Sequence, residues 1–526
     1  MAASERRGNF KSKKKGSIEP AILVTQEDWY NEAVKLEDGA ERWFLSDIKK
    51  TMKGYLAAME AYDRALVSEK PNVDDTYNIH YNQTRLLLKI YTDYINVDGC
   101  INLFQYVNLD GIESADALVV SIETIIKRFE TVVENFPNEV GWDLLFNLLT
   151  SYYTYVESET NIPGETLINI IPTFISHFHH IIRLENELLD KNEMADLDQV
   201  EVDDEEVDSY LRDNLVEQTA VDFSTGSGIK TKIQENETPG LALSMETFDK
   251  ETVIDTLALG YKFVNEIMAN QLESENTAPG EIVNIAQKNY VEELLVKFIG
   301  QLDEMVLASN VKELEAQELI TAKRSIESLK FLYRRDLQAF LSTLERTDEN
   351  AMMSSVELLD MALHTFTADS SWQLRTSLSK TLGKLQTMIA ERQSDIVTGK
   401  LKNKYNELSP TVFSLCEIMI NRADNELARC LLKQAELDQL QGQPHPEEDI
   451  ERTIRILQQN ARTLLTNAKA IAHKSCGFNE YITDKLKRNY IYGQATMRLD
   501  IIESPGSGKL PEDLEDQPFY KALCMS

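Results

Sequence analysis

The sequence predicts an all-α protein, and two observations support this prediction. Glycine (21) and proline (13) are scarce in a chain of 526 residues, at about half their usual combined share. A chain this poor in turn-forming residues cannot supply the turns that many short β-strands need. Apolar residues also recur at spacings of three and four over long stretches, which is the period of one helix face. We therefore expect long helices, and the length allows two or more cores.

The first half begins with a polar segment and continues as helices. Residues 1–27 are charged and lack apolar periodicity, which is typical of a disordered tail. Helices are expected over residues 29–48, 50–68, 77–95, 115–135, 140–157 and 166–187. Turn signals at Pro71-Asn72, Asp98-Gly99, Pro137 and Pro163-Gly164 separate them.

The second half is helical as well. An apolar stripe runs through residues 291–305, and residues 312–345 show charged pairs at helical spacing, such as Lys323 with Glu327. The most regular stripe consists of Ile454, Leu457, Ala461, Leu464, Ala468 and Ile471. Its alternating steps of three and four are typical of a coiled-coil-like pairing or of a helical repeat.

These patterns divide the chain into five parts. They are a disordered basic tail (1–27), a helical array (28–187), an acidic linker or insertion (188–250), a C-terminal helical domain or continuation of the array (251–503) and a polar tail (504–526). The linker is assigned because apolar periodicity is lost there.

The net charge of −33 is unevenly distributed. Residues 1–15 carry six basic side chains against one acidic one, whereas residues 185–208 carry twelve acidic side chains against Lys191 alone. The rest of the chain is acidic too. Because an acidic surface repels phosphate backbones, we expect basic proteins as partners and do not expect nucleic acid. The alternative is that the acidity serves solubility alone.

The expected location is the cytoplasm, the nucleus or both. Five cysteines are spread along the chain without a CxxC pair, which is typical of free thiols in a reducing compartment. No apolar run reaches the ~18 residues of a membrane span, and the N-terminus lacks the apolar segment of a signal peptide. Lys13, Lys14 and Lys15 form a candidate nuclear-import signal, with a solubilising tail as the alternative.

Two stretches of the first half carry the spaced residues of a helix–turn–helix repeat. One stretch has Phe129, Val132 and Pro137, followed by Trp142 and Leu145; the other has Leu45, Ser46, Ala58, Tyr62, Ala65 and Pro71. On these residues, the region from about 29 to 187 resembles a tetratricopeptide (TPR) array. Large residues stand where the motif has small ones, as at Phe146, so we expect a degenerate, irregularly curved array.

The resemblance implies a superhelix of antiparallel helix pairs whose concave face binds an extended peptide or a partner helix. Tyr77, Tyr81 and Tyr91 are then candidate aromatic contacts in the groove, and core packing is the alternative explanation for them. Asn147 matches an asparagine with which some members of the family clamp a chaperone's C-terminal carboxylate. However, Asp143 stands where that clamp needs a lysine, so we do not expect this ligand.

Signals for catalysis and metal binding are weak. Residues 226–231 and Gly508-Lys509 are glycine–lysine clusters, but both lack the complete ending of a phosphate loop and follow no predicted strand. His177, His179 and His180 lie close in sequence, yet no nearby cysteine completes a zinc site. We expect no enzymatic activity, no cofactor and no metal.

The expected function is therefore that of a non-catalytic protein-binding scaffold or adaptor of the TPR type. In its sharper form the protein is an escort or assembly factor for a basic client, attracted by the acidic run and selected by the groove. The densest part of that run is Glu201, Asp203, Asp204, Glu205 and Glu206. The alternatives are a stoichiometric subunit of a larger nuclear or cytoplasmic complex and, more distantly, an enzyme with a helical fold.

Overall fold

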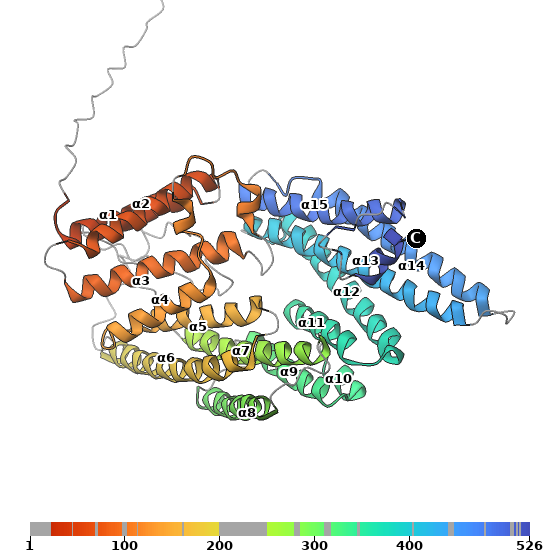
Figure 1. Cartoon of the computed structure of the whole chain (residues 1–526), viewed down its shortest axis with the longest axis horizontal. Coiled ribbons are helices and arrows are strands. Elements are labelled where there is room, and N and C mark those ends of the chain that lie inside the picture. Colours follow the sequence, from red (N-terminus) through yellow and green to blue (C-terminus); the bar gives the residue numbers. More distant parts are fainter. Residues whose placement is uncertain are drawn as a thin grey trace, which may run out of the picture.

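The computed structural model describes residues 23–198 and 250–525 (Figure 1). Short breaks fall at residues 45, 69–71, 97–101, 113, 160–161, 278–284, 310–316, 345–347, 402–403, 440–445, 478–479, 505, 507–509, 512–513 and 515–516. The described residues are almost entirely helical and contain no β-strand, which confirms the all-α prediction. The basic tail up to residue 22 and most of the acidic linker lie outside the described residues.

The first half of the chain forms six helices with short connections. They are α1 (Gln26–Glu41), α2 (Ile48–Leu66), α3 (Val73–Ile90), α4 (Ile122–Asn135), α5 (Trp142–Ser158) and α6 (Gly164–Asp198). A π-helical turn, η1 (Tyr91–Ile95), extends α3, and two 3-10 turns, η2 (Leu103–Tyr106) and η3 (Ala115–Ala117), precede α4.

The second half contributes ten more helices. They are α7 (Lys250–Thr277), α8 (Ile285–Ala308), α9 (Gln317–Tyr333), α10 (Leu337–Thr343), α11 (Glu349–Thr365), α12 (Ala368–Val397), α13 (Leu408–Gln439), α14 (Pro446–Ala472), α15 (Ile482–Glu503) and α16 (Pro518–Met525), with the 3-10 turn η5 (Tyr405–Glu407) before α13.

Local capping explains several helix starts. Thr25 and Asp28 form a capping box at α1: the Asp28 amide donates to Thr25 Oγ1 (3.1 Å) and the Thr25 amide donates to Asp28 Oδ2 (3.0 Å). Asp47, Asp336 and Asp348 directly precede α2, α10 and α11, respectively. The carboxylate of each accepts a hydrogen bond from the backbone amide of the third residue of its helix. Such caps satisfy backbone donors that a helix start leaves unpaired.

Some helix boundaries differ from those expected. Helix α1 ends at Glu41, the helix expected over 115–135 begins in full only at Ile122, and α6 continues to Asp198, past its expected end at residue 187. The helix expected over 312–345 is two helices, α9 and α10, because Arg335 adopts a left-handed conformation (φ 57°) that a continuous α-helix cannot contain. Lys323 pairs with Asp303 of α8 (2.7 Å) rather than with Glu327 of its own helix.

Residues 504–526, expected to be a polar tail, are instead part of the C-terminal core through α16. Leu514, Phe519 and Tyr520 are buried. The Tyr520 hydroxyl donates to Asp424 Oδ1 of α13 (2.6 Å), and Arg498 Nε of α15 donates to the same carboxylate (3.1 Å). One half-buried aspartate therefore connects three helices of the C-terminal region.

From α11 to α15 and from α1 to α6 each helix contacts the next one in the chain, whereas α7 lies between α5 and α9, and α8 packs on α6 and α7 (Figure 1). Helices α13 and α14 form a long antiparallel pair: the Cys416 thiol donates to Ala468 O, and the Cys430 thiol to Ile454 O. The buried stripe of α14 is Ile454, Leu457, Ala461, Leu465, Ala468 and Ala472. Ala468 belongs to both the predicted and the observed stripe, but Leu465 and Ala472 are buried in place of Leu464 and Ile471. This drift is expected for a straight helix of period 3.6 rather than a supercoil of period 3.5.

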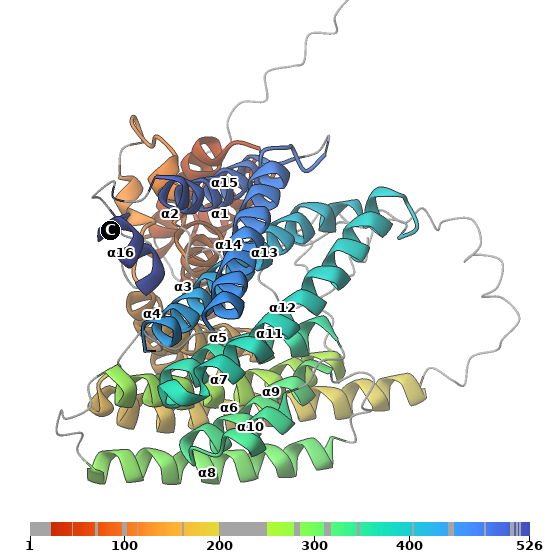
Figure 2. The ribbon, with the colours of Figure 1, turned by 90° about the vertical axis from the view of Figure 1, so that its right-hand side faces the viewer.

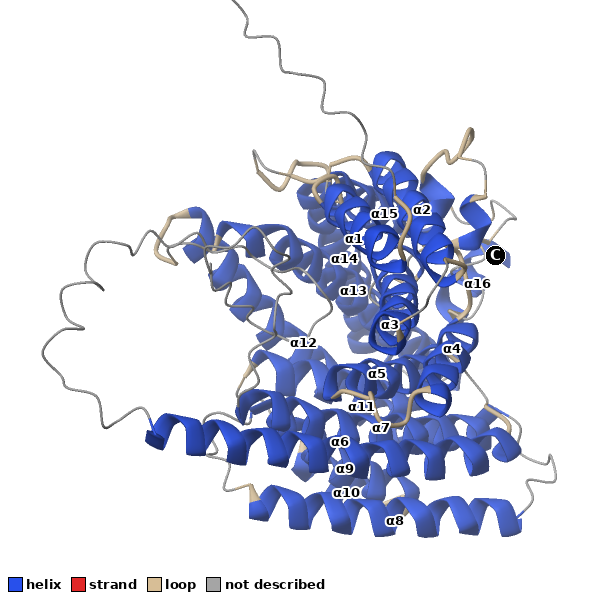
Figure 3. Cartoon of the chain, turned by 90° about the vertical axis from the view of Figure 1, so that its left-hand side faces the viewer, coloured by secondary structure: helices blue, strands red, loops and turns tan. Residues whose placement is uncertain are grey.

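The α6–α7 seam is the antiparallel contact between these two helices. The Phe174 ring stacks on Phe263 with centroids 3.6 Å apart. A Cβ on Gly260 would lie 2.8 Å from side-chain atoms of both Phe178 and Leu302, so only glycine fits there without displacing them. Helix α8 packs against both α6 and α7 and forms one edge of the molecule (Figures 2 and 3).

The first and last parts of the chain also meet. Helix α15 contacts η2, and in Figure 1 it lies beside the segment that follows α3. The chain therefore curls back on itself, and the C-terminal helices lie next to the N-terminal ones.

Candidate functional site

The three tyrosines that the sequence proposes as groove residues lie on α3 and η1. Tyr77 and Tyr91 are buried and Tyr81 is half-buried. The rings of Tyr77 and Tyr81 stack, the Gly141 amide donates to Tyr77 Oη (3.3 Å) and the Asn147 side chain donates to Tyr81 Oη (3.0 Å). The structure thus brings together Tyr77, Tyr81 and Asn147, in a contact that fixes α3 against α5. Their role in binding a partner stays a prediction.

The remaining predicted site residues lie outside the described residues. These are the acidic cluster Glu201, Asp203, Asp204, Glu205 and Glu206 and the basic group Lys13, Lys14 and Lys15.

Three glutamates from separate helices form a cluster that the sequence did not reveal. They are Glu157 near the end of α5, Glu266 in the middle of α7 and Glu357 in α11. We call this set the glutamate cluster. Buried apolar residues on the same helices, such as Val156, Ile267 and Leu358, pack these helices together and so bring the three carboxyl groups within electrostatic reach of one another.

The packing of the three helices raises the pKa of each carboxyl group in the cluster. Desolvation is the largest cause that raises the pKa of each, and it raises the pKa of Glu266 to about 7. Repulsion from Glu157 adds to the shift at both Glu266 and Glu357. Yet Glu157 and Glu357 have solvent-exposed side chains.

Few cations compensate the glutamate cluster. Lys262 on α7 lowers the pKa of Glu157, but its ammonium group is hydrogen-bonded to Glu318 of α9. The Tyr153 hydroxyl donates to Glu157 Oε1 (2.9 Å). Within the described part of the chain, no salt bridge involves any of the three glutamates. The cluster therefore concentrates negative charge that a cationic side chain from outside could neutralise.

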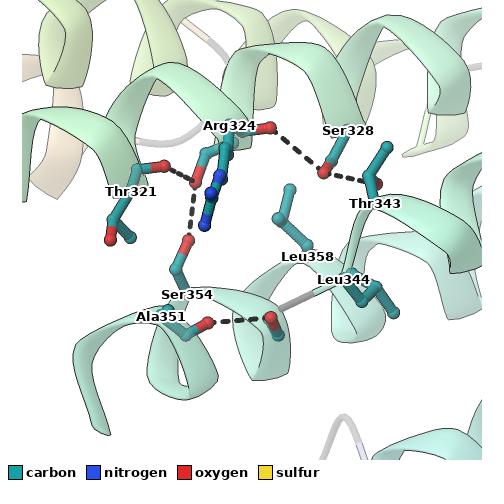
Figure 4. A pocket seen from close by; sticks show the side chains of 10 residues that line it. Thr321, Arg324, Ser328, Thr343, Leu344, Ala351, Ser354 and Leu358 are labelled. Atoms are coloured by element: carbon teal, nitrogen blue, oxygen red, sulfur yellow. Dashed lines mark hydrogen bonds between the residues drawn. The ribbon is translucent and has the colours of Figure 1, made fainter. Parts of the chain in front are cut away.

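A hollow lies between α9, α10 and α11 (Figure 4). Its cavity volume is about 10 Å³, which is far below the ~300–1,000 Å³ of a typical ligand site. Its hydroxyl groups bond to each other: Ser325 to Ser354 and Ser328 to Thr343, both at 2.7 Å. Arg324 is the only ionisable residue in its lining, so the lining supplies no base to activate a serine.

The three histidines of α6 do not converge on a common point. Burial lowers the pKa of all three, while Glu130 of α4 acts on His177 and Glu187 acts on His180. The His179 ring instead meets the edge of Phe298 on α8. Across residues 23–198 and 250–525 no group of three or more metal-ligating side chains is arranged to hold a metal ion. None of the described helices combines the length and apolar content that a membrane span requires.

Comparison with known proteins places the chain in a family. The uncharacterized protein YNL193W of Saccharomyces cerevisiae is 35% identical to it over 523 residues, covering 93% of this chain and 92% of the relative. The chain belongs to the family of YNL193W-like proteins. A family model described as the YNL193W-like protein middle domain matches residues 158–334, and one described as the YNL193W C-terminal domain matches residues 344–524. No solved structure matches the chain.

The boundaries of these two family models follow the helices. The middle-domain match begins at the last residue of α5 and ends just after α9, and the C-terminal match covers α11 to α16. Glu266 lies in the first match, Glu357 lies in the second and Glu157 directly precedes them. The glutamate cluster therefore joins a residue of each matched region with Glu157, which directly precedes the first.

Proposed function

We propose that this YNL193W-like protein is a non-catalytic protein-binding scaffold of the TPR type that holds a basic segment of a client protein. The single observation that carries the proposal is the glutamate cluster, in which like charges act on one another and the cation that acts on Glu157, Lys262, is already bound to Glu318. Ionised carboxyl groups so placed repel each other, and a lysine or arginine from a partner would relieve that repulsion. In an escort or assembly factor this attraction would also speed the encounter with the client.

The order of the first helices supports a stack of antiparallel helix pairs. In such a stack every second helix runs in the same direction. Polar contacts join α1 to α3 in parallel register: Gln26 to Thr76, Tyr30 to Asn82, Glu37 to Arg85 and Glu41 to Lys89. The contacts of Tyr77 with Gly141 and of Tyr81 with Asn147 continue this register from α3 to α5.

The test is a comparison of two triple variants with equal loss of charge. The first replaces Glu157, Glu266 and Glu357 by glutamine, and the control replaces the exposed residues Glu391, Glu448 and Glu451 of α12 and α14. Each full-length protein is purified by affinity from its own cells, and its bound proteins are eluted stepwise with salt. A third variant without residues 199–208 tests the acidic run separately.

We expect the wild type and the control variant to retain one basic partner. Moderate salt should release this partner from both proteins. Three charge contacts of about 0.5 kcal/mol each correspond to about a tenfold loss of affinity in the first variant. If both triple variants retain the partner equally, the glutamate cluster is not its binding site.

A second candidate is a stoichiometric subunit of a larger complex. The observation that favours it is the outer face of α8, where Val296 (66%) and Leu307 (82%) are exposed at the edge of the molecule and Tyr290 is exposed nearby. This function would be supported if a fixed set of partners remained bound in high salt and in the glutamate variant. The same partners should be lost when Val296 and Leu307 are replaced by serine.

A further inference from the structure

Glu185 of α6 is a buried carboxylic acid in the α6–α7 seam. Its side chain has no exposed surface (0%). Thr256 Oγ1 of α7 donates to Glu185 Oε1 (2.7 Å). Among the described residues, no hydrogen-bond partner is found for Glu185 Oε2. Since an ionised carboxylate buried with one hydrogen bond and no cation is costly, this geometry suits a neutral, protonated acid.

The charged groups around Glu185 offer no compensation. On α7, the charged neighbour that acts on it is Asp255, which carries the same sign. On its own helix, Arg183 and Glu187 are exposed.

The charged groups at corresponding positions of α8 and α5 are also acidic. Helix α8 runs parallel to α6, since Gly164 lies beside Gln287 and His179 beside Phe298. At the level of Glu185, α8 carries Asp303, which is held by Lys323 and Tyr261, and the exposed Glu304. Helix α5 runs antiparallel to α6, with Tyr152 against Phe174, and its corresponding charge is Asp143, which acts on Tyr77.

We propose that Glu185 is a proton-controlled lock of the α6–α7 seam, which holds α6 against α7 while the carboxyl group is neutral and releases it on ionisation. The lock is placed at the end of α6 from which the acidic run continues. Its release would detach the last described turns of α6 from α7. This control of the seam goes beyond the proposed binding function and does not depend on it.

The sign of the pH effect follows from the two states of the seam. Burial raises the pKa of Glu185 to about 8; Asp255 adds to this shift and the Thr256 hydroxyl opposes it. In the open seam the carboxyl group is solvated and returns to its ordinary pKa of 4.5. The closed state therefore holds a proton that the open state loses between these two values. Opening should become about tenfold more frequent per pH unit across this range and level off above it.

The test is amide hydrogen exchange of residues 182–190 between pH 5.5 and 9, corrected for intrinsic exchange rates. In the wild type, protection should fall about thirtyfold between pH 6 and pH 7.5. Glu185→Gln should abolish this fall, because a glutamine cannot ionise, whereas the control Glu187→Gln at an exposed position of the same helix should keep it. Equal pH dependence of the wild type and Glu185→Gln would overturn the proposal.

A second variant keeps the test decisive if Glu185→Gln fails to fold. Thr256→Val removes the donor that favours the ionised carboxyl group, so the pH at which protection levels off should move upward. If the pH at which protection stops falling were unchanged or lower in Thr256→Val than in the wild type, this result would contradict the lock.

Discussion

Glu266→Gln should make the protein more stable and at the same time poorer at binding its partner. The reason is that Glu266 has its pKa raised to about 7 from its ordinary value of 4.5, by desolvation first and then by Glu157, Glu357 and Glu273. A raised carboxyl pKa means that the folded state binds more protons than the unfolded state. The stabilising contribution of the protonated Glu266 carboxyl group is therefore fully present below about pH 4.5. It falls as the pH rises toward 7 and stays low above that pH.

The magnitude follows from the same shift. The rise from 4.5 to about 7 corresponds to about 3 kcal/mol of lost stability once the carboxyl group is ionised. Because Glu266 is half-buried and not fully shielded from solvent, we expect about half of this, so Glu266→Gln should gain ~1–2 kcal/mol at pH 8. The gain should shrink at pH 5.5, where the wild-type carboxyl group is largely protonated.

The assay is urea unfolding followed by circular dichroism at pH 5.5, 7 and 8. The range stays above the isoelectric point of about 4.7, where solubility is lowest. Glu391→Gln, at an exposed position of α12, is the matched control and should change stability by less than ~0.5 kcal/mol.

Binding of the partner recovered from cells is measured for the same proteins. If the glutamate cluster is kept for binding at a cost in stability, Glu266→Gln should raise the free energy of unfolding and lower the affinity for the partner. A Glu266→Gln variant that is less stable than the wild type at pH 8 would refute the electrostatic reasoning. A variant that is more stable but binds the partner equally well would refute the functional part.

Three further predictions concern stability. Gly260→Ala should cost ~1–3 kcal/mol in urea unfolding, because its Cβ would overlap the side chains that pack at the seam. Tyr520→Phe should cost ~1–3 kcal/mol and speed amide exchange in α16, because Asp424 loses a part-buried hydrogen bond. Unchanged α16 exchange would show that apolar burial alone holds this helix. Arg85→Ala should cost ~2–3 kcal/mol at pH 8, because it leaves the buried Glu37 carboxylate unpaired. That cost should be smaller at pH 5.5, because desolvation raises the pKa of Glu37 and its carboxyl group can then take up a proton. An equal cost at both pH values would argue against a charge effect.

The helices themselves were largely predictable because their signals are local. The face of α2 formed by Tyr55, Ala58, Tyr62 and Ala65 is buried as the periodicity predicts. The ends of α5 fall within two residues of the predicted ones, since Pro137 and Pro163-Gly164 mark its boundaries in the sequence. Residues 504–526 were the exception. Their few apolar residues are too short a pattern to indicate burial, and only the fit of Tyr520 against Asp424 makes α16 part of the core.

The sequence by itself determined the helical class, most helix positions and the acidic character of the protein, because periodicity, turn residues and charge are properties of the chain. The tertiary structure alone decided which acidic residues matter electrostatically. Glu157, Glu266 and Glu357 are far apart in the chain and have no distinctive neighbours in sequence, and packing of α5, α7 and α11 makes them a cluster. Glu185 is the first residue of the long acidic run in the sequence, yet its side chain is completely buried against α7. Desolvation depends on which helices cover a side chain, and no local pattern in this chain encodes that.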